Sequence, residues 1–449
     1  MKNDLKDKKV LKRIHLIAVG GAIMHNLAIA LARKGYKVTG SDDAIYDPAK
    51  TNLEKEGLLP LIGWNADCII NDIDVVILGM HARGDNPELL RAKELGLKIM
   101  SFPEFVAEDC KDKKRVVIGG SHGKTTTTAM IMHVLSKLNI AFDYLVGSSI
   151  DGFDLSVQLS DAPLVIIEGD EYLSSPLDLR SKFLWYNPHI SILTGIAYDH
   201  INVFPTFEGY IDTFRQFVET HEKDGIYFWY KGDEHLTRLA EGTSVRNNAY
   251  TTPLFEVTDG EATILFNGKK FPLAVVGQHN LENLEAASLV CEQLGISRET
   301  FFASAADFTG AGRRMEKIYE YNNQVVYRDF AHSPSKLAAT TKAIKQTYNN
   351  DLFAVFELHT FSSLNKDFLP LYKDAMHYAD KAIVFYNEAV FAHKRMEVLT
   401  KEFVAACFGN VQVINEVSEL EKEVAAAFGV GNNILLMSSG KFEGAKFSF

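Results

Sequence analysis

The stretch of sequence that decides the fold reads Gly119-Gly-Ser-His-Gly-Lys-Thr-Thr126. A β-branched run at residues 115–119 precedes it, and an amphipathic helical pattern at 126–138 follows it. A phosphate group needs backbone N–H donors that no Cβ atom obstructs, and glycines at the start of a helix provide them. In a P-loop, a lysine contacts the β- and γ-phosphates and a hydroxyl binds Mg²⁺. The sequence therefore predicts an ATP site formed by Gly120, Ser121, His122, Gly123, Lys124, Thr125 and Thr126.

One position departs from the full P-loop pattern. Ile118 stands where that pattern has glycine, whereas the core from Gly123 to Thr125 and its place between strand and helix remain. The alternative interpretation is a glycine turn whose lysine is merely solvated.

On both sides of the loop, short apolar runs alternate with helical patterns. This alternation predicts an α/β fold with parallel sheets covered by helices on both faces. A charged segment at 108–115 and the pair Arg313-Arg314 suggest boundaries, so we expect units at 1–111, 112–314 and 315–449. Expected strands lie at 14–19, 37–40, 75–79, 98–100, 115–119, 164–167, 190–194, 325–327, 353–356, 382–385, 411–414 and 434–437, and expected helices at 24–34, 87–95, 126–138, 281–294 and 336–348.

Three carboxylates follow one of the buried runs, in Ile166-Ile-Glu-Gly-Asp-Glu171. The carboxyl end of a parallel strand is where an open α/β sheet places its site. Adjacent carboxylates repel one another, so either one is protonated or a cation lies among them. Together with the P-loop, this pattern predicts Glu168 as a Mg²⁺ ligand. The alternative is an acidic loop that caps the next helix.

Further polar clusters follow other strands or begin helices. Tyr198-Asp-His200 ends a strand, and Asp329 and His332 stand between a strand and a helix. Asn280 and Asn283 are one helical turn apart, so both amides can face the same side, as the recognition of a purine edge requires. The alternative for the asparagines is a helix start, because asparagine is a good N-cap.

Composition narrows the function. The chain has 449 residues, of which 47% are hydrophobic, and a formal net charge of −11. Such a surface repels nucleic acid and anionic membranes, and no segment approaches the roughly 20 apolar residues of a membrane span. Four scattered cysteines are expected to be reduced and mostly buried. We therefore expect a soluble cytoplasmic protein, with residues 1–13 as a charged tail.

Taken in order, these motifs resemble the Mur ligases, ATP-dependent enzymes that build the peptide of peptidoglycan on UDP-N-acetylmuramate. The resemblance covers nearly the whole chain and includes the Gly20-Gly21 turn and Asn86-Pro-Glu88 near the N-terminus. It implies a Rossmann-like N-terminal domain that binds the UDP-sugar, a central P-loop ATPase domain, and a Rossmann-like C-terminal domain that supplies the amine-substrate pocket.

The resemblance also implies roles for individual residues. Lys124, Glu168 and His200 would be catalytic, and Thr125, Glu168 and His200 would hold Mg²⁺. The remaining expectations assign Asn280, Asn283, Arg314 and Asp329 to ATP, Gly20, Gly21, Asp42 and Asn86 to the UDP-sugar, and His332 and His359 to the amine pocket.

The resemblance leaves two amine substrates open. Arg180-Ser-Lys-Phe183 is most like members that join L-alanyl-γ-D-glutamyl-meso-diaminopimelate to UDP-N-acetylmuramate in peptidoglycan recycling. The alternative is the addition of L-alanine in peptidoglycan biosynthesis. The pattern departs from the tripeptide type at Glu357-Leu-His359, and Ser333 stands where many members have a second histidine.

Two other classes of protein share part of this pattern. A nicotinamide-dependent oxidoreductase would use the Gly20-Gly21 turn and Asp42, but the third glycine of the dinucleotide pattern is missing. A non-catalytic module that closes on ATP would use the P-loop but would release no phosphate in response to an amine.

Overall fold

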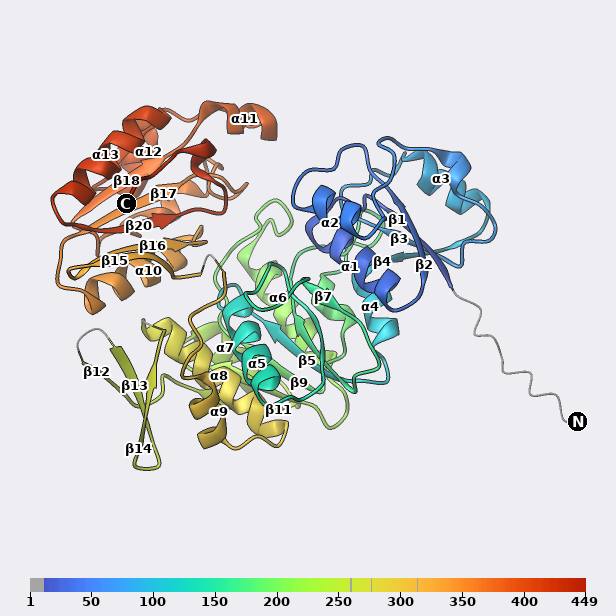
Figure 1. The fold of residues 1–449 in the computed structure, drawn as a ribbon, viewed down its shortest axis with the longest axis horizontal. Helices are drawn as coiled ribbons and strands as arrows, with labels where there is room; N and C mark the ends of the chain where they lie inside the picture. The colour runs from blue at the N-terminus through green and yellow to red at the C-terminus, as the bar shows by residue number, and fades with distance from the viewer. Residues whose placement is uncertain (1–11, 259–260, 276, 313) are drawn as a thin grey trace, which may run out of the picture. The chain divides into compact units, whose positions relative to one another are not determined.

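The computed structural model describes residues 12–258, 261–275, 277–312 and 314–449 (Figure 1). Most of the expected charged tail and Arg313 lie outside these residues. By contacts the chain divides into two compact units: Met1–Gly119 with Ile140–Ser191 and Gln216–Ile226, and Gly120–Asn139 with Ile192–Arg215 and Tyr227–Phe449. The division at 1–111, 112–314 and 315–449 stays a prediction. None of the described helices is long and apolar enough to cross a membrane.

The N-terminal sheet has four parallel strands in the order β2-β1-β3-β4. Its buried residues include Ile17, Val76 and Leu78, so the apolar runs form the predicted core. The strands and helices expected here are confirmed, with ends shifted by a few residues. The elements are β1 (Arg13–Ile17), α1 (Ala22–Arg33), β2 (Lys37–Ser41), α2 (Ala49–Lys55), β3 (Val75–Leu78), α3 (Pro87–Glu94), β4 (Lys98–Ser101) and α4 (Phe102–Asp109).

The next sheet has seven strands in the order β11-β10-β9-β5-β8-β6-β7. β5 and β8 run parallel, and Ile118 of β5 pairs with Glu168 of β8. The elements are β5 (Lys114–Gly119), α5 (Lys124–Lys137), β6 (Asp143–Leu145), β7 (Val157–Gln158), β8 (Leu164–Glu168), β9 (Ile190–Leu193), α6 (Phe207–Glu219), β10 (Ile226–Tyr230), α7 (Glu234–Glu241), β11 (Arg246–Tyr250), α8 (Gln278–Gln293) and α9 (Arg298–Ala305).

The charged segment at 108–115 is not solvated throughout. Arg115 is buried, and its guanidinium donates to the carbonyl of Asn187 over 2.9 Å and contacts Glu222. Lys113 pairs with the fully buried Asp143. This part of the chain therefore uses its charges for internal contacts.

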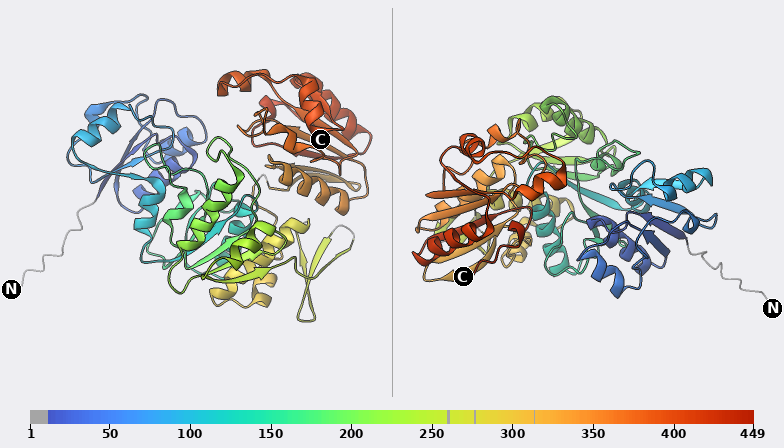
Figure 2. Two further views of the ribbon diagram at one scale, coloured as in Figure 1. Left: turned by 180° about the vertical axis from the view of Figure 1, so that it is seen from behind. Right: turned by 90° about the horizontal axis from the view of Figure 1, so that it is seen from above.

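A three-stranded antiparallel sheet, β12-β13-β14, was not predicted from the sequence. Its strands are β12 (Phe255–Thr258), β13 (Glu261–Phe266) and β14 (Lys269–Leu273). The left view of Figure 2 shows it as a ribbon of its own beside the yellow helices α8 and α9. β14 contains Pro272 and two lysines, which weaken the strand pattern in the sequence.

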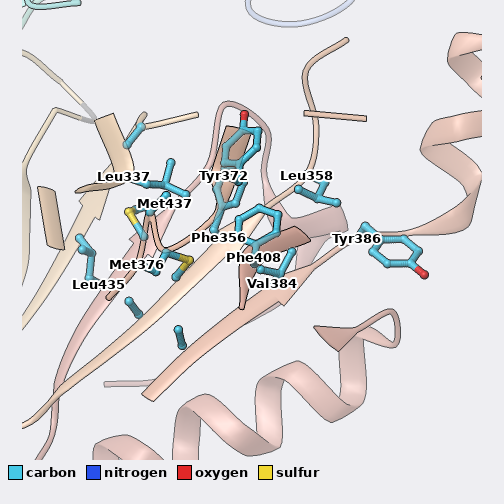
Figure 3. Packing of buried hydrophobic residues seen from close by; sticks show 14 of the residues in the cluster. Leu337, Phe356, Leu358, Tyr372, Met376, Val384, Tyr386, Phe408, Leu435 and Met437 are labelled. Atoms are coloured by element: carbon cyan, nitrogen blue, oxygen red, sulfur yellow. The ribbon is translucent and has the colours of Figure 1, made fainter. Parts of the chain in front are cut away.

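The C-terminal sheet has six strands in the order β15-β16-β20-β17-β18-β19, parallel except for the β15–β16 hairpin. Along β17, Ala354 and Phe356 face one buried cluster, whereas Phe353 and Val355 face another, so both faces of the sheet are covered. Figure 3 shows Phe356, Tyr372 and Phe408 packed together in the first cluster. The elements are β15 (Glu316–Tyr321), β16 (Gln324–Asp329), α10 (Pro334–Thr347), β17 (Leu352–Glu357), β18 (Lys381–Phe385), α11 (Glu388–Lys394), α12 (Lys401–Phe408), β19 (Gln412–Ile414), α13 (Val417–Gly429) and β20 (Asn433–Met437).

Candidate active site

The predicted P-loop lies between β5 and α5, as the sequence indicated. Gly120 and Gly123 have φ of 128° and 80°, a region that L side chains rarely adopt. A Cβ on Gly120 would collide with Thr194, and one on Gly123 would collide with Asn283. Nζ of Lys124 donates to the carbonyl of Gly120 over 2.7 Å, so the lysine folds back over the loop. Both glycines are therefore required by the conformation and by close packing.

The position of Ile118 in the fold explains why the sequence departs from the full P-loop pattern there. It is fully buried and belongs to β5, so the loop begins after it.

The residues after β9 fix the loop in place. Oγ of Ser121 lies 2.8 Å from the hydroxyl of Tyr210 and accepts from the amide of Ala197 over 2.9 Å. Thr194 donates its hydroxyl to the carbonyl of His122. These contacts hold the loop conformation before any ligand binds.

The imidazole of His122 is neutral in this environment. Burial has the largest effect, and together with the positive charges of Lys336 and Lys124 and the nearby His279 it lowers the pKa of His122 to about 3. Nδ1 of His122 is buried and has no hydrogen-bond partner among the described residues. A neutral imidazole next to two ammonium groups adds no further positive charge to the loop.

Asn280 and Asn283 are both buried in the first two turns of α8. The N-cap of this helix is Gly277, which has φ of 90°, so the alternative of an N-cap role is wrong for both asparagines. Asn283 packs against Gly123. The structure therefore brings one of the two predicted adenine-binding residues to the P-loop.

Glu168 ends β8, opposite Ile118 and therefore beside the strand that leads into the P-loop. Its Oε2 accepts from the amide of Gly147 over 3.0 Å. Asp170 has a cation from the chain itself, because Nζ of Lys182 lies 2.5 Å from its Oδ2. The sequence predicted either a protonated carboxylate or a cation among the three. For Asp170, the cation is the ammonium group of Lys182.

The loop after β9 contacts the C-terminal sheet through Asp199. Nε2 of His332 lies 3.7 Å from Oδ2 of Asp199, and the hydroxyl of Ser362 donates to Oδ1 over 3.1 Å. Burial alone would raise the pKa of Asp199, but the contact with His332 and the charges of His200 and Lys336 outweigh it and hold that pKa well below its usual range. A buried carboxylate thus stays charged at the point where these elements meet.

His332 lies between β16 and α10, as predicted, whereas the prediction that a strand ends at His200 is wrong, because β9 ends at Leu193 and His200 lies in the loop after it. His200 has φ of 55°, and its amide donates to Oδ1 of Asp199 over 2.7 Å. Burial lowers the pKa of His332, the charge of Lys336 lowers it further, and Asp199 partly offsets both effects. His332 is therefore poised as a neutral group beside a carboxylate.

Asp329 and Arg314 have partners within the protein. Asp329 accepts from the amide of Met315 over 3.1 Å and from the hydroxyl of Thr340 over 2.8 Å. The guanidinium of Arg314 lies over the ring of Phe330 at 4.4 Å. Both residues lie where the chain enters the C-terminal sheet, so they order this junction whether or not a nucleotide binds.

The predicted UDP-sugar residues gather in the N-terminal sheet. Oδ2 of Asp42 accepts from the amide of Gly20 over 2.7 Å, so the glycine turn and the end of β2 are in direct contact. Asn86 is the N-cap of α3 and accepts from the amides of Glu88 and Leu89. Burial raises the pKa of Asp42, against the hydrogen bond from Gly20. Asn86 therefore has a structural role that accounts for its burial.

Several functional candidates were missed by the sequence analysis. Lys336 influences the pKa of His122, Asp199 and His332, and Thr194, Tyr210 and Ser362 make direct contacts at the site. Lys336 lies in the first turn of α10, immediately after the His332 segment, and this position at a strand–helix junction was the available signal. The others are ordinary residues whose sequence context contains no such signal.

Comparison with known proteins covers the chain from end to end. The Mur ligase family catalytic domain matches residues 13–114, the Mur ligase middle domain 118–291, and the Mur ligase glutamate ligase domain 313–440. The UDP-N-acetylmuramate–L-alanyl-γ-D-glutamyl-meso-2,6-diaminoheptandioate ligase of Haemophilus influenzae is 28% identical over 97% of both chains. The UDP-N-acetylmuramate–L-alanine ligase of Caldicellulosiruptor bescii is 31% identical over 83% of both.

A solved structure agrees with these relatives. A murein peptide ligase from Psychrobacter arcticus superposes with a TM-score of 0.67 and 25% identity, and each chain covers 97% of the other. The resemblance seen in the sequence and the expected fold are thereby confirmed, and the oxidoreductase and non-catalytic alternatives are wrong. The chain belongs to the Mur ligase family and is an ATP-dependent ligase that forms a carbon–nitrogen bond.

Proposed function

We propose that the chain joins L-alanyl-γ-D-glutamyl-meso-2,6-diaminoheptanedioate to the carboxylate of UDP-N-acetylmuramate, using ATP. The observation that carries this proposal is the share of the chain that each kind of relative matches. The tripeptide ligases from Haemophilus influenzae and Escherichia coli match 97% and 96% of the chain, whereas the L-alanine ligases from Caldicellulosiruptor bescii and Clostridium perfringens match 83% and 82% of it. A similarity that extends over nearly the whole C-terminal region includes the part that would read the amine.

The reaction requires activation of a carboxylate, because oxide is a very poor leaving group. Transfer of the γ-phosphoryl group of ATP gives an acyl phosphate, and attack by the amine then releases phosphate. In such reactions the protein positions the groups and neutralises charge. Lys124 and the N–H groups of the P-loop would bind the β- and γ-phosphates. Because the loop is already fixed by internal contacts, ATP binding would not need to order it.

Thr125, Glu168 and His200 would hold Mg²⁺, which neutralises phosphate charge when bound. The donor set fits, because a hydroxyl and a carboxylate are hard oxygen ligands. Glu168 uses Oε2 to accept from Gly147, and a carboxylate has further lone pairs for a cation. The imidazole is the less typical member of the set for this ion.

The remaining predicted residues would bind the rest of the substrates. Asn280 and Asn283 would contact adenine, and Arg314 and Asp329 would approach the nucleotide from the C-terminal sheet. Gly20 and Gly21 would donate to the UDP pyrophosphate, with Asp42 at the ribose and Asn86 nearby. The single N–H of Gly20 donates to Asp42 in this structure, so binding of the pyrophosphate by Gly20 would exchange that bond for one to the ligand. His332 and His359 would line the amine pocket, and the three units at 1–111, 112–314 and 315–449 would carry the three substrates.

The second candidate is the addition of L-alanine, which the 31% identity to L-alanine ligases favours. One assay separates the two. The purified protein with ATP, Mg²⁺ and UDP-N-acetylmuramate is offered either L-alanine or the tripeptide, and the new amide is detected by mass. We expect the tripeptide product. A product with L-alanine alone would overturn the proposal and establish the second candidate.

A further inference from the structure

Three side chains form a cluster at the edge of the C-terminal sheet. Glu357, His359 and Glu443 each offer a ligand atom, and these atoms all lie within 4.8 Å of one another. Glu357 is the last residue of β17, His359 follows it closely, and Glu443 comes after the carboxyl end of β20. These strands are parallel neighbours, with Phe356 opposite Met437. The cluster therefore lies at the edge of the sheet where α/β folds place ligands.

The cluster is held in a fixed shape. Glu357 is only 3% exposed, accepts from the amide of Phe442 over 2.9 Å and also contacts the hydroxyl of Ser438. A Cβ on Gly440 would lie 2.8 Å from both Oε2 of Glu357 and Nδ1 of His359. A glycine at this position thus keeps the space between the carboxylate and the imidazole open.

Two buried atoms, one of them beside this space, have unused hydrogen-bonding capacity. Nδ1 of His359 and Oγ of Ser439 have no hydrogen-bond partner in the described part of the chain. Unpaired buried polar atoms are rare in folded proteins, because each costs the loss of its hydration. Nδ1 of His359 lies on the same side of Gly440 as the carboxylate of Glu357, so both can accept from a ligand with several N–H donors.

The chemistry of the three groups specifies a cation. Two carboxylates and an imidazole supply acceptors that converge on one point, and an ammonium group has three N–H donors and a positive charge. In the tripeptide, the diaminoheptanedioate has two amino groups, of which one forms the peptide bond and the other is free. L-Alanine has a single amino group, which is the nucleophile.

We propose that Glu357, His359 and Glu443 bind the free ammonium group of the terminal diaminoheptanedioate, and so select the tripeptide over L-alanine. This inference rests on the proposed function. The loop that carries His359 continues to Ser362, which donates to Asp199 beside His200. One end of this loop therefore lies at the predicted reaction centre, and the other holds the cluster that reads the far end of the peptide.

The test compares the tripeptide with an analogue in which hydrogen replaces the free amino group. The wild-type enzyme should prefer the tripeptide by about ten- to hundredfold in kcat/KM, the range for a hydrogen-bonded charged group. Glu443→Gln should reduce this preference to within about threefold. Glu443 is exposed, so its replacement does not disturb the core. Glu419→Gln, at an exposed site in the first turn of α13, is the matched control and should keep the full preference.

Each contrary outcome has a distinct meaning. Ligation of the tripeptide with no preference over the analogue, or with a preference that Glu443→Gln retains, would overturn the ammonium site and leave the proposed function intact. Ligation of L-alanine alone would overturn both. Binding of Mn²⁺ without nucleotide, measured by electron paramagnetic resonance and lost in Glu443→Gln, would show that the cluster holds a metal ion instead and would overturn the inference.

Discussion

Nε2 of His332 lies 3.7 Å from Oδ2 of Asp199, although the two residues are far apart in the sequence. Asp199 precedes His200 after β9, and His332 stands between β16 and α10. The pair therefore ties the loop next to the P-loop to the strand ends of the C-terminal sheet. If this contact helps to form the catalytic arrangement, its two members act as one unit.

A double-mutant cycle tests this coupling. Asp199→Asn and His332→Asn should each lower kcat/KM for the amine, and the double variant should lose less than the product of the two effects. We expect a coupling of about fivefold, or about 1 kcal/mol, because contacting residues typically couple by 0.5–3 kcal/mol. His377→Asn, at an exposed position, is the control. Additive effects of Asp199→Asn and His332→Asn would show that the contact is not part of the working site.

Lys124→Ala should abolish amide formation. The ammonium group lies over the P-loop, and loss of one preorganised charge contact in a transition state costs about 3 kcal/mol or more, which is a hundredfold or greater loss of rate. Phosphate release and product mass are the measurements, and circular dichroism shows that the variant is folded. Near wild-type turnover in a folded Lys124→Ala variant would remove the P-loop assignment.

Glu168→Gln should raise the concentration of Mg²⁺ needed for half-maximal activity. The amide keeps an acceptor for Gly147 but loses the negative charge that favours a divalent cation. The measurement is a Mg²⁺ titration of activity at saturating ATP. Glu222→Gln provides a control in which a carboxylate paired with Arg115 is neutralised instead. An unchanged Mg²⁺ titration in Glu168→Gln would count against this residue as a ligand.

His122 should make the protein less stable in acid. Because its pKa is lowered to about 3 in the fold, the unfolded chain binds a proton near pH 6.5 while the folded chain does not. Stability from this group is therefore complete above pH 6.5 and falls as the pH decreases towards 3, by up to about 1.4 kcal/mol per pH unit. In His122→Gln, the urea midpoint measured without nucleotide should fall less between pH 7 and pH 5 than in the wild type. Equal falls would mean that the imidazole is protonated in the fold.

The P-loop and its neighbouring strands could be predicted because their signals are local. Gly120 and Gly123 are required by the backbone itself, and the buried strands are continuous apolar runs. The loop therefore lies between a buried strand and a helix, as its sequence indicates. The β12–β14 sheet could not be predicted in the same way, because lysines and Pro272 interrupt its alternation and its strands pair only with one another.

The pairing of charges at the site could not be predicted from the sequence. Asp170 pairs with Lys182, and Asp199 with His332 and Ser362, through contacts that depend on how separate elements pack. A sequence pattern identifies which groups are chemically capable, but burial and partners decide their charge. The pKa of Asp199 illustrates this point, because burial and neighbouring cations act on it in opposite directions.

The buried apolar cluster around Phe356 should contribute strongly to the stability of the C-terminal sheet. Phe356 is fully buried, and its ring centre lies 5.5 Å from that of Tyr372 and 5.9 Å from that of Phe408 (Figure 3). Phe356→Ala should cost about 3–5 kcal/mol, because it removes buried area and leaves a cavity. Leu371→Ala, at a side chain that is 54% exposed, should change stability by less than about 0.5 kcal/mol.

Hydrogen exchange is the appropriate measurement for this pair of variants. The three tryptophans, Trp64, Trp185 and Trp229, all precede the C-terminal sheet, so their fluorescence does not report on it directly. Exchange of the β17 amides, followed by mass spectrometry, reports the opening of this sheet. We expect faster exchange in Phe356→Ala and wild-type exchange in Leu371→Ala. Unchanged protection of the β17 amides in Phe356→Ala would show that this cluster does not hold the strand in place. Because Phe356 immediately precedes Glu357, the same variant should also weaken selection of the tripeptide.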